Sequence, residues 1–157
     1  MEGLPTHPVV VHLPLVLAVL LPLVSGAIGY AVWKGRASGR LWAWVVAGHF
    51  VLFASAGAAS LLGEADARRI QTRIDADVVE VHEAEGHRLL FASGITFALA
   101  LAGLVLQRPK QRHTAMAATF AFGLACAALG VLAGRGGAVL VYQHGAAAAW
   151  SEPAPAD

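Results

Sequence analysis

Charged residues are scarce in this sequence, and the scarcity is concentrated in four long segments. Only 13% of the 157 residues are charged, against about 25% in an ordinary soluble domain. Residues 8–33, 41–63, 89–107 and 114–134 contain no Asp, Glu, Lys or Arg. At about 1.5 Å rise per residue, each segment can cross a hydrocarbon core about 30 Å thick. The pattern therefore predicts an all-α membrane protein, a bundle of four transmembrane helices in a single domain.

Sulfur-containing residues are also rare, with one cysteine and two methionines in the chain. The single Cys126 excludes an internal disulfide, and its place in an apolar segment predicts a buried packing thiol. Copper sites often use cysteine or methionine ligands, so their rarity counts mildly against copper. Nothing in the composition indicates nucleic-acid binding.

Acidic residues are absent from two short loops, 34–40 and 108–113, which together carry six Lys and Arg residues. All ten acidic residues lie on the other side of the predicted membrane. By the positive-inside rule, the basic loops are cytoplasmic and both termini face outward. We therefore expect a multi-pass protein of the plasma (inner) membrane, with periplasmic or extracellular termini.

The outer connection, residues 64–88, has a helical pattern of its own. Ile70, Ile74, Val78 and Val81 recur at helical spacing with charged residues between them. Such a segment forms an amphipathic helix, which either lies on the membrane surface or extends the third span outward.

The C-terminal region is predicted to form a cap. Gly136 and Gly137 permit the fourth helix to bend or break. The apolar residues 138–142 would then fold back over the outer mouth of the bundle and bring His144 with them. Residues 146–157 are expected to form a frayed tail.

Seven histidines are the most informative feature of the chain. His113 belongs to a cytoplasmic loop, and His49 lies inside the second span. The other five gather on the outer side: His7, His12, His82, His87 and His144. Neutral imidazoles are the commonest metal ligands, and pairs of histidines hold haem iron.

The spacing of these histidines limits which of them can act together. His7 and His12 are five residues apart, and so are His82 and His87, so neither pair shares one face of a helix. A common site therefore needs one histidine from each segment. The natural candidates are His12, His82 and His144.

Three stretches resemble the DUF2231 family of small bacterial polytopic membrane proteins. They read HPVVVHLP at residues 7–14, HEAEG at 82–86 and LVYQHG at 140–145. The resemblance implies that the shared positions, and the candidate cofactor ligands, are His7, His12, His82 and His144. Family members occur fused to, or encoded near, c-type cytochrome and Rieske-type domains, which implies redox chemistry.

Three functions are compatible with these residues. The leading hypothesis is a b-type cytochrome with bis-histidine haem b near the periplasmic face, which passes electrons between quinol and an outer partner such as a c-type cytochrome. The first alternative is a copper or zinc binding or handling protein with ligands His12, His82 and His144, and His87 or His49 as secondary ligands. The second alternative is a structural subunit of a larger membrane complex. No catalytic constellation is visible, which leaves open whether the protein is an enzyme.

Overall fold

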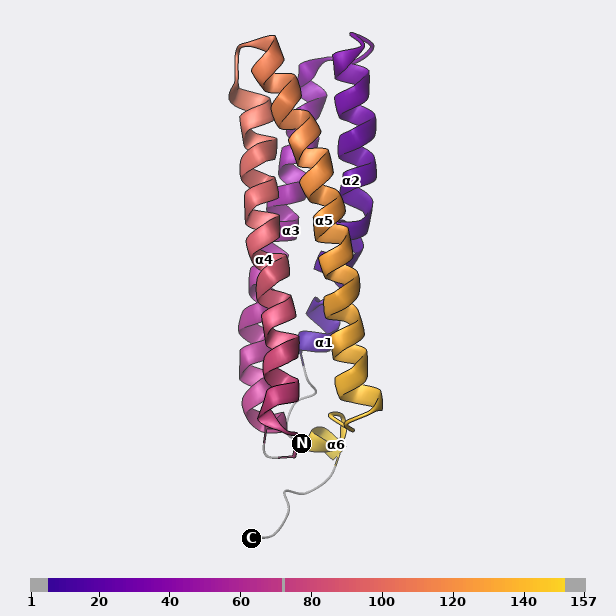
Figure 1. Cartoon of the computed structure of the whole chain (residues 1–157), viewed down its shortest axis with the longest axis vertical. Helices are drawn as coiled ribbons and strands as arrows, with labels where there is room; N and C mark the ends of the chain where they lie inside the picture. The colour runs from indigo at the N-terminus through magenta and orange to yellow at the C-terminus, as the bar shows by residue number, and fades with distance from the viewer. Residues whose placement is uncertain (1–5, 72, 152–157) are drawn as a thin grey trace.

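The computed structural model describes residues 6–71 and 73–151, and within them the chain folds into helices without strands. Four long helices run alternately up and down as a bundle (Figure 1). Their bounds are α2 His12–Trp33, α3 Trp42–Ile70, α4 Ala76–Val105 and α5 Pro109–Tyr142. Three short helices accompany them: α1 His7–Val10, η1 Gly39–Leu41 and α6 Ala148–Ser151.

The surface of the bundle is apolar where the surface of a soluble bundle would be polar. The most apolar windows of the four spanning segments have mean hydropathies between 1.8 and 2.3. Large side chains such as Leu23, Trp44 and Phe91 are 64–74% exposed, while small or polar groups such as Ala18 and Ser25 are fully buried. Lipid is as apolar as leucine, so helix contacts rely on small residues that let backbones approach. The predicted four-helix membrane bundle is confirmed.

The first predicted span is interrupted near its start. α1 ends at Val10, Val11 forms a turn, and α2 begins at His12. Pro14 explains the interruption, because proline has no backbone N–H to donate to Val10 and its ring crowds that carbonyl. α1 contacts both α2 and α3, and it lies near the lower end of the bundle in Figure 1. The break therefore sends His7 and His12 in different directions.

The outer connection extends the spans and forms no separate surface helix. Residues 64–70 continue α3, residues 76–88 begin α4, and a short turn joins them. Ile70, Ile74 and Val79 are buried together in this extension. The amphipathic pattern thus packs the extended helices against each other.

The predicted break at Gly136 and Gly137 is wrong, because α5 continues through both residues to Tyr142. The helix ends at Tyr142, and the chain turns at Gly145, whose φ of +68° few residues other than glycine adopt. The Ala146 N–H donates to the Leu140 carbonyl (3.0 Å), which ties this turn to the last turns of α5.

The C-terminal cap is built from residues beyond this turn. Ala146 is buried, and Ala149 and Trp150 pack against the cluster that contains Ile70, Val79 and Leu140. Residues 146–150, expected as part of a tail, thus close one end of the bundle, while residues 152–157 lie outside the described part of the chain.

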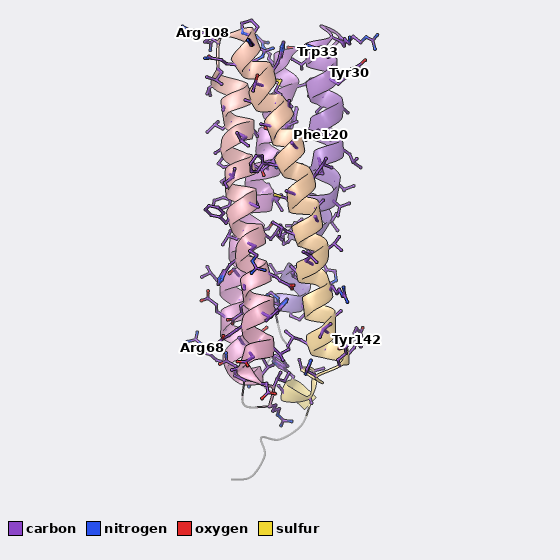
Figure 2. The ribbon with its side chains drawn as sticks, in the orientation of Figure 1. Tyr30, Trp33, Arg68, Arg108, Phe120 and Tyr142 are labelled. Carbon is purple, nitrogen blue, oxygen red and sulfur yellow. The ribbon has the colours of Figure 1, made fainter. Side chains whose placement is uncertain are left out.

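The two ends of the bundle differ in chemistry. The turn between α3 and α4 lies at the same end as α1 and α6, and Arg68 and Tyr142 mark this end in Figure 2. We call it the histidine end. The opposite end carries the two short basic loops, with Trp33 and Arg108 labelled in Figure 2. We call it the basic end.

Candidate functional site

His7 enters the bundle from the short helix α1. Its ring Nδ1 lies 2.8 Å from the Ala59 carbonyl oxygen of α3. A carbonyl oxygen only accepts, so Nδ1 carries the proton and donates it. In the neutral ring this tautomer leaves Nε2 with a free lone pair, which is the state of a metal-ligating histidine held by a second hydrogen bond.

His82 and Glu85 come from the first third of α4. They are three residues apart and therefore lie on the same face of the helix. The His82 Nδ1 and Glu85 Oε2 atoms are both buried, and neither has a hydrogen-bond partner among the described residues. Buried polar atoms in native proteins almost always have partners, so two unpaired ones three residues apart indicate a binding site.

The partly buried His7 and His82 rings make an edge-to-face contact. Their centroids are 6.1 Å apart and their planes are nearly perpendicular, at 82°. We call the side chains of His7, His82 and Glu85 the His7–His82 cluster. It lies between two apolar clusters, one with Leu52 and Leu89 toward the membrane interior and one with Val79 and Leu140 toward the histidine end. The polar groups are thus enclosed on both sides.

Glycines bring the backbone of two helices against these rings. A methyl group added to Gly63 of α3 would lie 3.2 Å from the His7 ring. One added to Gly137 of α5 would lie 3.3 Å from His82 Cε1, and one added to Gly136 would overlap the Glu85 carboxylate. Side chains at these positions would push the cluster apart. The glycine pair in α5 therefore serves close packing, and it does not break the helix.

His82 is held in its neutral form. It lies in the charged first part of α4, ahead of the apolar segment that begins at Leu89. Burial lowers the pKa of the His82 imidazole from its usual 6.5, and the nearby His7 lowers it further. Neutral imidazole is the form that binds metal ions, so the environment favours a ligand over a cation.

A cavity of about 480 Å³ opens beside His82 between α4 and α5. Its wall is formed mainly by the apolar side chains Val78, Val81, Leu132 and Val139. Three charged groups complete it, namely Asp77, Glu85 and Arg135. The cluster thus adjoins a largely apolar space with a cation in its wall.

Comparison with known proteins assigns the chain to a family. The family model described as "Predicted membrane protein (DUF2231)" matches residues 3–149. The chain belongs to the DUF2231 family. No curated protein and no solved structure matches it. The match covers the His7–His82 cluster, α5 and the cap, so these features lie within the family domain.

The remaining outer histidines lie apart from this cluster. His12 and His144 are exposed, and neither belongs to the wall of the cavity beside His82. The side chain of His87 is 54% exposed and faces Glu64 of α3, with 3.6 Å between Nε2 and Oε1. Of the family-matched histidines, the structure brings His7 and His82 together.

The two other histidines are separate from the histidine end. His49 is fully buried in the first third of α3, and His113 lies at the basic end, near the start of α5. Across residues 6–71 and 73–151, no group of three or more His, Cys, Asp or Glu side chains is arranged to hold a metal ion. The predicted trio His12, His82 and His144 is therefore not assembled as a metal site.

The ligands predicted from the sequence did not include Glu85, which was expected only to help attract cations together with Glu80 and Glu83, and Gly63 was not predicted as part of the site. Glu85 could have been found, because a spacing of three from His82 places it on the same helical face. Gly63 gave no signal, since its role depends on the path of α1.

Proposed function

We propose that this DUF2231 protein is a membrane redox protein that holds haem b between the imidazoles of His7 and His82. The observation that carries the proposal is the 6.1 Å between the two ring centroids. A metal–nitrogen bond is about 2 Å long and a ring centroid lies about 1 Å behind its nitrogen, so two axial imidazoles have centroids about 6 Å apart. Bis-histidine ligation is a common way to hold haem in a helical bundle.

Other features of the site fit the same group. The Ala59 carbonyl fixes the Nδ1–H tautomer of His7 and leaves Nε2 for the metal. The apolar wall of the adjoining cavity suits a porphyrin, and Arg135 in that wall suits a propionate. Haem bound here would supply one-electron chemistry, and the chain would supply ligands, tautomer control and exclusion of water.

The test is a visible spectrum of the purified protein, expressed with ample haem and reduced with dithionite. We expect sharp bands of low-spin haem b at one haem per chain. His7→Ala and His82→Ala should abolish them, while the matched controls His87→Ala and His113→Ala should leave them unchanged. A colourless protein overturns the proposal.

The same experiment tests the ligand assignment. His12→Ala and His144→Ala should retain the haem, because both side chains are exposed and apart from the cluster. If either variant loses the haem while His7→Ala keeps it, the iron is bound elsewhere.

Copper or zinc binding is the second candidate. The observation in its favour is the approach of His82 Nδ1 and Glu85 Oε2, an imidazole and a carboxylate, to the same glycine of α5. A colourless protein with one equivalent of copper or zinc, lost in Glu85→Gln, would favour this function. If the Glu85→Gln variant binds haem at unchanged occupancy, the copper or zinc function is excluded.

We also propose that the histidine end faces the periplasm or the exterior. The two loops at the basic end carry six Lys and Arg residues and no acid, which favours the cytoplasm. A cysteine at Ala76, introduced together with Cys126→Ala, should react with an impermeant reagent in intact spheroplasts, and one at Ser38 should not. The reverse pattern overturns the orientation. In the proposed orientation, His7 and His82 would hold the haem near the outer face, and it would supply one-electron chemistry between quinol and a c-type cytochrome outside the membrane.

A further inference from the structure

A second cavity, of about 510 Å³, lies between α2 and α5 at the basic end. Its walls include the aromatic side chains of Tyr30, Trp33 and Phe120, which are 38–57% exposed on the outside of the bundle. Figure 2 labels all three, with Tyr30 and Trp33 near the end marked by Arg108 and Phe120 nearer the middle. The cavity is therefore a groove that opens toward lipid.

Small residues of α2 form the floor of this groove. Gly26 and Gly29 both line it, together with Ala117 of α5. A methyl group added to Gly26 would lie 2.9 Å from the Phe120 ring. The Phe120 ring therefore packs directly on the backbone of α2 at Gly26. Beside this contact, the small residues of the lining leave an apolar slot that an extended hydrocarbon chain can enter.

The mouth of the groove is cationic. The Lys34 ammonium lies 4.2 Å from the centroid of the Trp33 ring and 5.8 Å from that of Tyr30. These cation–π contacts hold the charge beside the aromatic wall. Lys34 does not line the groove itself but lies beside two residues that do, Trp33 and Tyr30. His113 lines the groove, and both loops at this end lack acidic residues. An occupant with an anionic head and an apolar tail matches the groove at both ends.

We propose that the groove between α2 and α5 binds an anionic phospholipid, with its phosphate at Lys34 and His113 and an acyl chain along Gly26 and Gly29. Charge complementarity selects this occupant, because a basic pocket between membrane helices attracts anionic headgroups. A neutral quinone would use the slot but would gain little from the Lys34 charge. This site is independent of the His7–His82 cluster, which lies at the opposite end of the bundle.

The test titrates delipidated, detergent-solubilised protein with phosphatidylglycerol or with phosphatidylcholine, and counts bound lipids by native mass spectrometry. We expect one phosphatidylglycerol bound at least tenfold more tightly than phosphatidylcholine. Lys34→Ala should remove most of that preference. The matched control Lys110→Ala removes a loop charge that does not line the groove and should preserve it. Equal affinity for the two lipids, or equal effects of the two variants, overturns the proposal.

A second pair of variants tests the slot itself. Ala117→Phe fills the groove and should abolish tight binding of phosphatidylglycerol. Ala125→Phe is the control, because Ala125 is exposed on the same helix and does not line the groove. Haem content should be unchanged in both. A quinone that copurifies, is displaced by Ala117→Phe and is insensitive to Lys34→Ala would assign the groove to quinone and overturn the lipid.

Discussion

Two buried histidines of the bundle, His82 and His49, differ in what surrounds them. His82 faces a second imidazole at 6.1 Å and shares its helical face with Glu85. His49 is fully buried, and neither of its ring nitrogens has a hydrogen-bond partner among the described residues. The Phe50–Phe97 ring contact places Thr96 of α4 at about the same level of the bundle as His49. The Thr96 hydroxyl donates to the Ala92 carbonyl of its own helix.

The difference shows that burial alone does not make a histidine a ligand. A buried imidazole without a partner costs free energy because it has lost its hydrogen bonds to water. At His82 the same cost is incurred beside a second imidazole and a cavity, so the proposed haem would offset it. Among the described residues, His49 makes no side-chain hydrogen bond and lines neither cavity, and we propose no ligand role for it.

Among the substitutions that distinguish the surroundings of His82 from those of His49, Gly136→Ala is expected to have the largest effect. Gly136→Ala places a methyl group on the end of the flexible Glu85 side chain and 3.1 Å from His82 Nδ1, so both side chains should shift and haem occupancy should fall. Gly137→Ala, with its nearest contact at 3.3 Å, should have a smaller effect. Gly86→Ala in α4 meets no atom within 4 Å and serves as the control. Equal haem content in all three variants would contradict the assigned packing.

The next effect concerns His49, where the substitution is expected to stabilise the protein. His49→Leu removes two unpaired nitrogens at similar volume and should raise the free energy of unfolding by about 1–2 kcal/mol. The control His49→Gln keeps an unpaired polar group and should give no gain. Reversible unfolding in a detergent mixture measures both. If His49→Leu loses the haem, His49 is a ligand and the comparison fails.

The same two regions show how far the sequence predicts the structure. Apolar runs without charge locate membrane helices reliably, because the bilayer excludes charged groups along a fixed length. The choice between His7 and His12 needs the direction of α1, which depends on the break before Pro14 and on contacts with α3. Periodicity carries no information on such contacts.

The C-terminal region shows a local rule overridden by packing. Glycine costs about 1 kcal/mol inside a helix, which favoured a break at Gly136 and Gly137. The long helix α5 tolerates that cost, because the glycines let it approach His82 and Glu85. Gly145 was the better candidate for the end of the helical region, since glycine readily adopts the positive φ that often follows a helix.

A third prediction concerns pH and depends on the neutral state of His82. Its pKa is lowered on folding, so in mildly acidic solution the unfolded chain binds a proton that the folded chain does not. The His82 contribution to stability is fully present above the unfolded pKa of about 6.5 and is lost as the pH falls toward the lowered folded value. The melting temperature of haem-free protein should therefore drop between pH 7 and pH 5. His82→Leu should flatten this dependence, and an unchanged slope would show that other groups cause it.

The smallest effect is expected at His87, the exposed counterpart of the two buried histidines. Its ring is 54% exposed and lies 3.6 Å from the Glu64 carboxylate, which is 52% exposed. An exposed ion pair contributes about 0–1 kcal/mol, because water screens the charges and two mobile side chains must be held in place. His87→Ala should therefore change the free energy of unfolding by less than about 0.5 kcal/mol and leave the haem spectrum intact. Glu64→Gln should have an equally small effect, and the double variant should equal the sum of the two. A large loss of haem in His87→Ala would place a ligand on the other face of α4 and remove the distinction between buried and exposed histidines.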